Sequence, residues 1–391
     1  MRRISAQYII TNSGPPLKRA VIITDDNGTI TAIEDTAGKL DETRQVEFYN
    51  GIIIPAFVNC HCHLELSHLK NMIRSGSGLG NFVEQVRSIR EINTEMIIRS
   101  AREADNDMYM SGITLCADIC NTTDTFGIKQ NSKIEYFNLL EVFGIDPARA
   151  RRRLDEILRV AEKAKEMGLP YSLVPHATYS MSGELLRLLR YHTETNRITS
   201  IHFMESPDES DFLSEHSGNL ASSYERSGLL PEKIDTAGSH ARIVLDKVTP
   251  SGNLILVHNT FADRETVKKV MERGNTWWCL CPGSNKFIEN TIPPADMLLE
   301  EGCRIVVGTD SLASNTRLDI LSELLLLQEA FPDLSMEELV SWATINGAEA
   351  LGKGDELGKL EIGKKPGLLL LENVDLLNMK LLHDTTVTRL A

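Results

Sequence analysis

The stretch IIIPAFVNCHCHLELSHL, residues 52–69, holds an apolar run that ends in two histidines, His61 and His63. Such a run is typical of a buried strand, and residues two apart in a strand point to the same side of the sheet. The two imidazoles are therefore expected to face one point. Converging neutral imidazoles are a natural pair of metal ligands, but backbone carbonyls near a turn would satisfy them as well. The rest of the chain has to decide between these two interpretations.

Seven further apolar runs follow, and helical patterns lie between them. Near-continuous Val, Ile and Leu runs are typical of parallel strands that are buried on both faces. Eight strand–helix units predict an α/β fold, a closed (β/α)8 TIM-like barrel. The eight predicted strands are IIIPAFVN (52–59), GITLCADIC (112–120), IEYFNLLEVFG (134–144), PYSLVPHA (170–177), ITSIHFME (198–205), NLILVHN (253–259), TWWCLCP (276–282) and RIVVGTD (304–310).

The two ends of the chain have a different pattern, in which short β runs alternate with turns. DNG at residues 26–28 is a hairpin signal, and GLLLLE followed by TTVTRLA near the C-terminus is also β-rich. Chain termini often lie close together. We therefore expect residues 1–54 and 355–391 to build one small β-sandwich domain, and residues 55–354 to form the barrel.

Composition excludes several classes of partner. The chain has 391 residues and a formal net charge of −14, so nucleic-acid and acidic-membrane binding are not expected. No run of about 18 apolar residues is present, which gives no sign of a transmembrane helix. The seven cysteines form no C-x-x-C pair, so we expect a reducing, cytoplasmic compartment. Cys60 with Cys62, or Cys279 with Cys281, would offer thiolate ligands as an alternative metal site.

Polar side chains fall at the carboxyl ends of five predicted strands. Barrel active sites are built at these ends. Five histidines gathered on one rim together with carboxylates would be costly to bury without a metal or a reaction to use them. The sequence therefore predicts a metal site there. The residues on this rim are His61, His63, His176, His202, Glu205, His258 and Asp310.

These segments resemble the metal-dependent amidohydrolase superfamily, in particular its branch of deaminases and chlorohydrolases. The matching pieces occur in family order along nearly the whole chain. The loop HLELSHL (63–69) and GTDSLASN (308–315) are most similar to the aminodeoxyfutalosine deaminase group. The other matching pieces are PAFVNCHCHLELS (55–67), HATYS (176–180), HFMES (202–206), VHN (257–259), CPGSN (281–285) and LGKLEIGKKPGLLLL (357–371).

The resemblance implies a cofactor, one divalent metal ion. His61, His63, His202 and Asp310 would bind it, with zinc as the expected metal and iron as the alternative. A second ion would need a bridging carbamate on a lysine at the end of the fourth strand. His176 stands there instead, so the resemblance implies one ion and places His176 against the substrate.

The resemblance also implies the catalytic residues. Glu205 and His258 would be catalytic, and Asp310 would accept a proton from the attacking water. Glu205 would protonate a ring nitrogen, and His258 would stabilise the tetrahedral intermediate. Glu65 and His68, in the loop after the first histidine pair, are expected to bind polar groups of a small-molecule substrate.

The expected function is hydrolytic deamination of an aminopurine or a related aromatic ring, such as an aminodeoxyfutalosine- or adenosine-type substrate. Guanine and cytosine rings remain open, as does hydrolysis of a halide or an amide at the same metal. A different class is a non-catalytic scaffold that keeps a metal for stability, but such a scaffold would not need Glu205 and His258. Barrel enzymes of this kind are often dimers, so a homodimer is one expected assembly.

Overall fold

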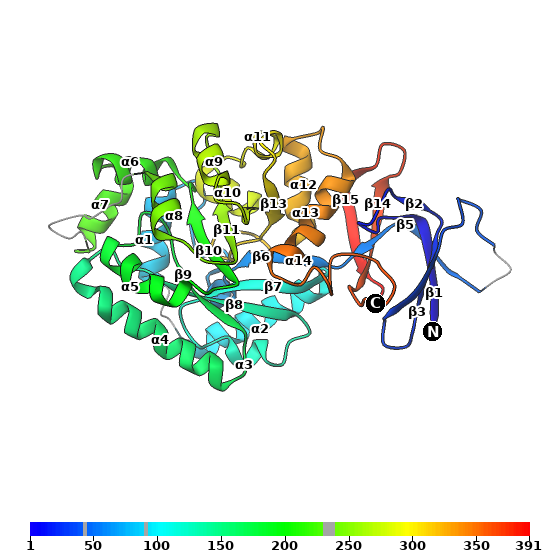
Figure 1. The fold of residues 1–391 in the computed structure, drawn as a ribbon, viewed down its shortest axis with the longest axis horizontal. Helices are drawn as coiled ribbons and strands as arrows, with labels where there is room; N and C mark the ends of the chain where they lie inside the picture. The colour runs from blue at the N-terminus through cyan, green and yellow to red at the C-terminus, as the bar shows by residue number, and fades with distance from the viewer. Residues whose placement is uncertain (42–44, 90–92, 230–238) are drawn as a thin grey trace.

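The computed structural model describes residues 1–41, 45–89, 93–229 and 239–391. Parts of both predicted domains, residues 42–44, 90–92 and 230–238, therefore lie outside the described residues. Figure 1 shows a large part built from strands and helices, and the strands of both chain ends side by side at one end of the molecule. Among the described residues, no helix combines the length and the apolar character needed to cross a membrane.

The large part contains two four-stranded parallel sheets, β6-β7-β8-β9 and β10-β11-β12-β13. Each predicted run overlaps one of these strands. The structure thus differs from the single closed sheet that we predicted. Within the described residues, the isolated bridges Cys62↔Asp310 and Ala177↔His202 join the two sheets at both seams. The N–H of Asp310 donates to the His61 carbonyl at 3.0 Å, and that of His202 donates to the His176 carbonyl at 2.8 Å. The strands are β6 (Phe57–Cys62), β7 (Ile113–Cys120), β8 (Glu135–Val142), β9 (Tyr171–Pro175), β10 (Ile198–Phe203), β11 (Asn253–His258), β12 (Thr276–Leu280) and β13 (Arg304–Val307).

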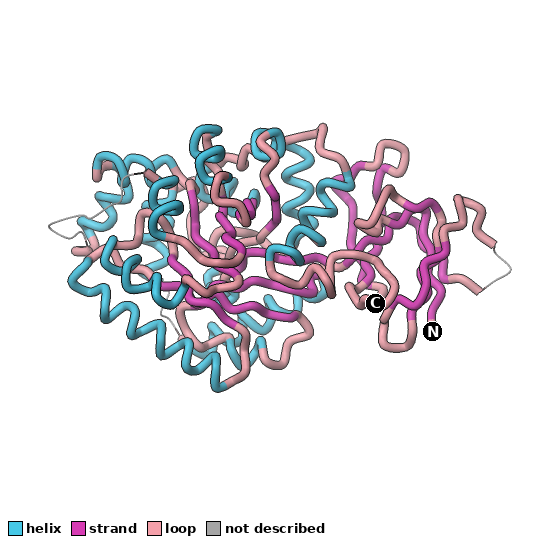
Figure 2. The backbone as a smooth tube through the Cα atoms, viewed as in Figure 1, coloured by secondary structure: helices cyan, strands magenta, loops and turns pink. Residues whose placement is uncertain are grey.

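Helices lie around these strands (Figure 2). In α4, the buried Leu154, Ile157, Ala161 and Ala164 recur every three or four positions, so one stripe of the helix packs on the core. The described helices are η1 (Leu64–Leu69), α1 (Leu79–Ile89), α2 (Thr94–Met110), α3 (Phe126–Lys129), η2 (Pro147–Arg149), α4 (Ala150–Glu166), α5 (Gly183–Thr193), α6 (Pro207–Glu215), α7 (Gly218–Arg226), α8 (His240–Lys247), α9 (Arg264–Met271), α10 (Pro282–Glu289), α11 (Ala295–Glu300), α12 (Ile320–Ala330), α13 (Met336–Ala343) and α14 (Ile345–Ala350).

The strands of both chain ends share one seven-stranded sheet of order β15-β14-β5-β1-β3-β4, with β2 paired to β1. Because they form a single hydrogen-bonded sheet, the predicted sandwich of two sheets is not confirmed. The strands are β1 (Arg2–Ile9), β2 (Leu17–Lys18), β3 (Val21–Thr24), β4 (Ile30–Glu34), β5 (Glu47–Pro55), β14 (Leu368–Asp375) and β15 (Lys380–Arg389).

The predicted first strand, residues 52–59, is in fact shared between the two sheets. Its first half belongs to β5, and pairing with β7 begins at Phe57, whose N–H donates to the Gly112 carbonyl at 3.0 Å. Pro55 lies at the junction. It has no N–H to donate to a ladder, so it suits the end of a strand. The histidines thus follow a strand, β6, that starts after this junction.

Candidate active site

The chain turns sharply at the strand ends that carry the predicted site residues. Met204, His258, Asn259 and Asp310 all have φ between 50° and 79°, in the left-handed region. Such a conformation costs a non-glycine residue on the order of 1–3 kcal/mol, so the surrounding structure must hold it, and it is concentrated at functional sites. At residue 308, glycine is required by close packing and not by its φ angle. A Cβ there would lie 2.7 Å from the Cβ of His61, so glycine allows the ends of β13 and β6 to approach.

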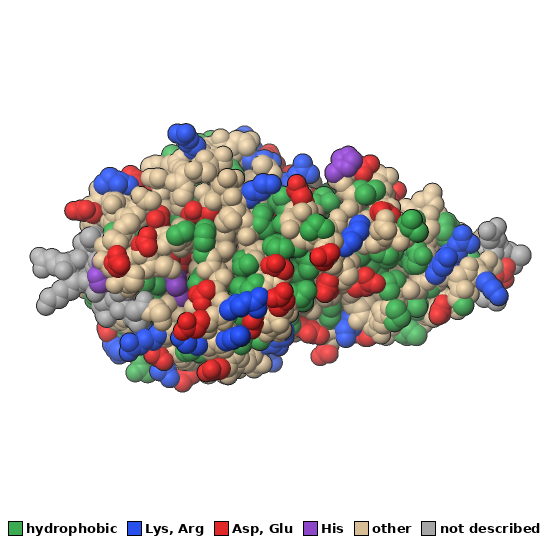
Figure 3. Space-filling model, turned by 90° about the horizontal axis from the view of Figure 1, so that it is seen from above, with side chains coloured by type: hydrophobic (Ala, Val, Ile, Leu, Met, Phe, Trp, Pro, Cys, Tyr) green, Lys and Arg blue, Asp and Glu red, His purple; other side chains and the backbone are tan. Residues whose placement is uncertain are grey.

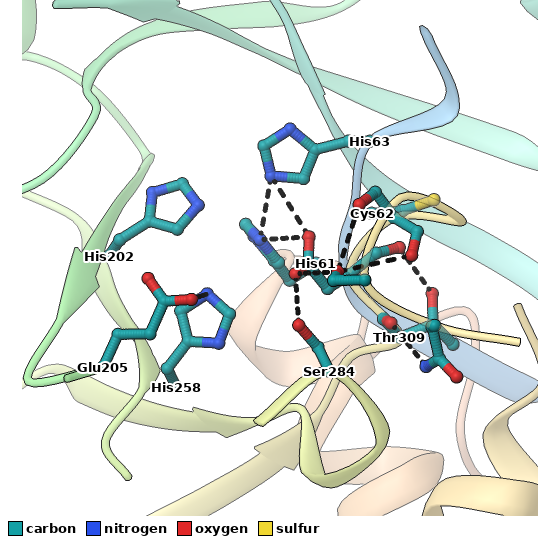
Figure 4. Close-up of polar contacts among 12 residues, drawn as sticks. His61, Cys62, His63, His202, Glu205, His258, Ser284 and Thr309 are labelled. Atoms are coloured by element: carbon teal, nitrogen blue, oxygen red, sulfur yellow. Dashed lines mark hydrogen bonds and ion pairs between the residues drawn. The ribbon is translucent and has the colours of Figure 1, made fainter. Parts of the chain in front are cut away.

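Three histidines converge above β6 and β10. The Nε2 atoms of His61 and His63 are 3.1 Å apart, and a nitrogen of His202 completes a group whose atoms all lie within 4.8 Å of one another. Figure 4 shows these rings directed toward a common space. The Oδ1 atom of Asp310 lies 3.7 Å from Nε2 of His61 and 3.5 Å from Nε2 of His63. Two ligands of a tetrahedral zinc ion would be about 3.3 Å apart, so this spacing fits one shared cation.

The protonation of these groups also fits a cation. Burial lowers the pKa of His61 and His202, so both rings are neutral near pH 7, which is the form that binds metal. The buried Nδ1 of His61 has no hydrogen-bond partner among the described residues. Burial would raise the pKa of Asp310, but His63, His258 and two serine hydroxyls outweigh it and hold the pKa below its usual value. Three imidazoles and one carboxylate make a donor set suited to a divalent ion.

Neighbouring residues orient these side chains. The hydroxyls of Ser284 and Ser314 donate to Oδ2 of Asp310 at 2.6 and 2.7 Å, which leaves Oδ1 facing the histidines. Nδ1 of His202 lies 2.7 Å from the His176 carbonyl and 3.5 Å from a carboxylate oxygen of Glu141. Its Nε2 is therefore directed to the opposite side. Such hydrogen bonds fix ring orientation and tune ligands in metal sites.

Glu205 and His258 form a second pair beside the histidine cluster (Figure 4). Oε1 of Glu205 lies 3.6 Å from Nε2 of His258, and the amide of Asn285 bonds the other ring nitrogen of His258 at 3.0 Å. Burial, followed by the charges of Glu209 and Asp310, raises the pKa of Glu205 well above its usual value. Burial also lowers the pKa of His258 to about 3. The pair thus combines a carboxyl group that holds a proton with a neutral imidazole.

A cavity of about 600 Å³ opens over these groups. One wall is apolar, and the rim carries arginines from α1 and from the η2–α4 region. The predicted site residues that line it are His63, His176, His202, Glu205, His258 and Asp310. The apolar wall includes Leu79, Phe82, Val83 and Val86 of α1, and the arginines are Arg87, Arg149 and Arg153.

Comparison with known sequences decides the family. Residues 52–388 match the sequence family described as the amidohydrolase family. The chain belongs to the amidohydrolase family. It is a hydrolase that acts on carbon–nitrogen bonds, and its cofactor is a divalent metal ion.

Individual proteins similar to this amidohydrolase are deaminases by name. An adenosine deaminase of Helicobacter pylori is 27% identical over 338 residues, which are 82% of this chain and 79% of the relative. A 5-methylthioadenosine/S-adenosylhomocysteine deaminase of Haloarcula marismortui is 26% identical over 90% of this chain and 80% of its own. The structure of Helicobacter pylori aminofutalosine deaminase with methylthio-coformycin superimposes with a TM-score of 0.78 at 22% identity, and covers 96% of this chain and 93% of that chain.

Two residues expected to bind substrate in this amidohydrolase lie elsewhere. Glu65 and His68 are buried in η1 and do not line the cavity. Oε2 of Glu65 accepts hydrogen bonds from the backbone N–H groups of Asn121 and Thr122 at 3.0 and 3.1 Å. Nδ1 of His68 lies 3.1 Å from the Glu65 carbonyl. The expectation of direct substrate contact is therefore not supported by this geometry, because Glu65 joins the loop after β6 to the loop after β7.

Sequence reasoning missed four residues around the site of this amidohydrolase. Glu141 at the end of β8 lines the cavity, and it was read only as part of an apolar run. Its position at a strand end was a usable signal. Ser284, Asn285 and Ser314 lie in CPGSN and GTDSLASN, two of the pieces that carry the family resemblance. The resemblance did not indicate which atom each side chain would bind.

Proposed function

We propose that this amidohydrolase is a deaminase that replaces an exocyclic amino group of an adenine-type ring with oxygen from water. One observation carries the proposal. The carboxyl group of Glu205 lies beside His258 in the same cavity as the cluster of His202, His63 and Asp310. A metal that served only stability would not need this second pair. The relatives named as adenosine and 5-methylthioadenosine/S-adenosylhomocysteine deaminases support the substrate class.

The residues that would hold the metal are His61, His63, His202 and Asp310, and we propose zinc. Imidazole and carboxylate ligands suit zinc, while the same set would also accept iron. The spacing of 3.1 Å between Nε2 of His61 and Nε2 of His63 supports one shared ion. When bound, a divalent ion acts as a Lewis acid and lowers the pKa of water from about 15.7 to about 7.

The remaining steps belong to side chains of the chain itself. Asp310, with Oδ2 held by two serine hydroxyls, accepts the proton of the attacking water through Oδ1. Glu205, which its raised pKa keeps protonated, donates to the ring nitrogen beside the attacked carbon. His258 hydrogen-bonds the oxygen that adds to that carbon. Asp310 passes the proton of the water to the amino group, the carbon–nitrogen bond breaks, and the amino group leaves as ammonia. The added hydroxyl gives its proton back to Glu205 as the ring carbonyl forms.

The outer cavity suggests what the ring is attached to. A purine fills only part of a cavity of about 600 Å³, and the remainder is bounded by the apolar stripe of α1 and by arginines on the rim. We propose an adenine nucleoside whose 5′ side carries an apolar or aromatic group, with a carboxylate that reaches the arginines. The run RARRR, residues 149–153, is therefore not one solvated helix face, because Arg149 and Arg153 line the cavity.

The proposed function is tested by incubating the zinc-loaded protein with adenosine, 5′-methylthioadenosine, S-adenosylhomocysteine, aminodeoxyfutalosine, guanine and cytosine. Ammonia is measured together with the shift in ultraviolet absorption when an aminopurine becomes an oxopurine. We expect ammonia from at least one 5′-substituted adenine nucleoside. Turnover of 6-chloropurine riboside or of an amide without any ammonia from the aminopurines would replace deamination by one of those reactions.

The arginines lead to a prediction about specificity. Arg153→Ala should lower kcat/KM for a carboxylate-bearing nucleoside by about 10–100-fold, since a hydrogen bond to a charged group contributes about 1.5–3 kcal/mol. Turnover of adenosine, which has no carboxylate, should change less than about twofold. Arg151→Ala is the matched control, because Arg151 lies on the same helix, is 72% exposed, and pairs with Asp155, whereas Glu156 also binds Arg153. Equal losses for both nucleosides in the Arg153 variant would contradict an anionic subsite.

We further propose that residues 55–354 act as one closed barrel and that residues 1–54 and 355–391 form a separate small β domain. The bridges at both seams between the parallel sheets support closure. The pairing of β5 with both β1 and β14 supports a domain made from the two chain ends. A cytoplasmic location is also proposed, and the seven buried free thiols support a reducing compartment.

A further inference from the structure

Glu209, on the first turn of α6, is fully buried four residues after Glu205. Its Oε1 atom accepts the backbone N–H of Glu205 at 2.7 Å and that of Ser206 at 3.3 Å. In an ordinary capping box, the glutamate at the third helical position binds only the N-cap N–H, here that of Ser206. The shorter bond goes to the residue before it, which is the proposed proton donor. Glu209 thus does more than cap α6.

The turn that Glu209 holds is under strain. Met204, directly before Glu205, has φ of 50°, which is unfavourable for a residue with a long side chain. This turn directs the Glu205 side chain into the cavity, where Oε1 faces His258. Two amide hydrogen bonds to one carboxylate oxygen are a direct way to keep the chain in this conformation.

The other oxygen of Glu209 reaches a different loop. Oε2 accepts the hydroxyl of Thr178 at 3.2 Å, and Nδ1 of the buried His240 lies 3.0 Å from the same hydroxyl. Thr178 lies in the loop that follows β9, two residues after His176, which lines the cavity. One carboxylate therefore joins the loop that carries Glu205 to the loop that carries His176.

We propose that Glu209 is a positioning residue, which clamps the turn that carries Glu205 and ties it to the loop that carries His176. Its importance for turnover rests on the proposed deaminase function, whereas the clamp itself does not. Without the clamp, the strained turn relaxes and the carboxyl group of Glu205 moves away from the ring nitrogen. A displacement of about 1 Å can cost on the order of 10²-fold in rate.

Three variants of the zinc-loaded, full-length protein separate this role from helix capping. Glu209→Ala removes both amide contacts and should lower kcat by about 10²-fold, with KM changed less than about threefold. Glu209→Gln keeps a carbonyl oxygen for the Glu205 N–H and should restore most of that loss. Glu338→Ala is the matched control, because Glu338 completes the same capping box with Ser335 on α13, and it should leave kcat unchanged.

Hydrogen–deuterium exchange of the amides of Glu205 and Ser206 provides a readout that needs no substrate. Both amides should exchange at least about 10-fold faster in Glu209→Ala, and neither should change in Glu338→Ala. Metal content measured by elemental analysis should stay the same in all variants. If Glu209→Ala does not fold, Thr178→Val, which removes the donor to Oε2, should show the same two changes to a smaller degree.

Each outcome of these measurements bears on the proposal. Unchanged exchange in Glu209→Ala, or in Thr178→Val if that variant is needed, would overturn the clamp. Faster exchange with unchanged kcat would overturn the positioning role, and so would an equal loss of kcat in Glu338→Ala. If the wild-type protein deaminates none of the nucleosides, the proposed function fails, and exchange alone then decides whether the clamp exists.

Discussion

Glu205→Gln is expected to lower kcat by about 10²–10⁴-fold, the contribution typical of a general acid. Glutamine keeps the size of the side chain but cannot deliver a proton to the ring nitrogen. In the wild-type protein, burial and the charges of Glu209 and Asp310 raise the pKa of Glu205, so the protonated form persists toward neutral pH. The wild-type rate should therefore decrease as pH rises through this raised pKa, and the residual rate of the variant should lack that step.

Steady-state kinetics against pH, with metal content measured on the same samples, checks this prediction. Glu205 is not among the proposed metal ligands, so the variant should keep one equivalent of metal. Glu184→Gln is a suitable control, because Glu184 is a carboxylate on α5 paired with Arg187 at the surface, and its loss should not alter kcat. A Glu205→Gln protein with wild-type turnover would exclude the proton-donor role and revive a non-catalytic metal scaffold.

The fold was predictable to the level of its strands because apolar β runs and helix-period segments alternate along the chain. The domain limit was placed between residues 54 and 55, but the division of the predicted strand 52–59 into β5 and β6 at Pro55 was not predicted. Residues 52–59 are apolar throughout, and only the pairing partners, β14 for one half and β7 for the other, divide them. The β-rich pattern of the two chain ends predicted that they build one domain. Whether their strands form one sheet or two facing sheets depends on hydrogen bonding between residues more than 300 positions apart.

The candidate ligands were predictable because parallel strands bring their carboxyl ends together. The position of Glu141 at the carboxyl end of β8 also predicts a site residue. It was overlooked because the residues around it in β8 are apolar. Glu65 shows the opposite case. It lies two residues after His63, yet its carboxylate accepts hydrogen bonds from the N–H groups of residues 121 and 122 and does not line the cavity. Sequence spacing places a side chain near a site, but competing backbone donors decide its direction.

The surface agrees with a small-molecule enzyme. Figure 3 shows one face on which acidic and basic side chains are interspersed. Arg151 with Asp155, and Arg152 with Glu156, lie on the exposed side of α4 at distances of 3.1 and 2.9 Å. Arg149 and Arg153 of the same helix region also have local partners, Asp146 at 3.1 Å and Glu156 at 3.0 Å, but they line the cavity. The distribution of arginines thus separates a solvated stripe from a rim able to bind an anionic substituent.

His61→Ala is expected to remove the metal and with it all measurable deamination. His61 is fully buried, its Nε2 lies 3.1 Å from that of His63, and Oδ1 of Asp310 lies 3.7 Å away. Alanine removes one of four proposed ligands from the centre of the cluster. Elemental analysis should show that bound metal falls from about one equivalent toward zero, because loss of even a supporting hydrogen bond can cost 10–100-fold in metal affinity.

The wild-type protein and His61→Ala should differ in how their Tm responds to metal removal. A ligand that binds only the folded state stabilises it by about 4 kcal/mol when present at about 1,000 times its Kd. Chelation should therefore lower the Tm of the wild-type protein and leave that of His61→Ala nearly unchanged. His383→Ala, at a side chain that is 95% exposed on β15, should behave as the wild type in both measurements. A His61→Ala protein that retains one equivalent of metal and responds to chelation would show that the ion is held elsewhere.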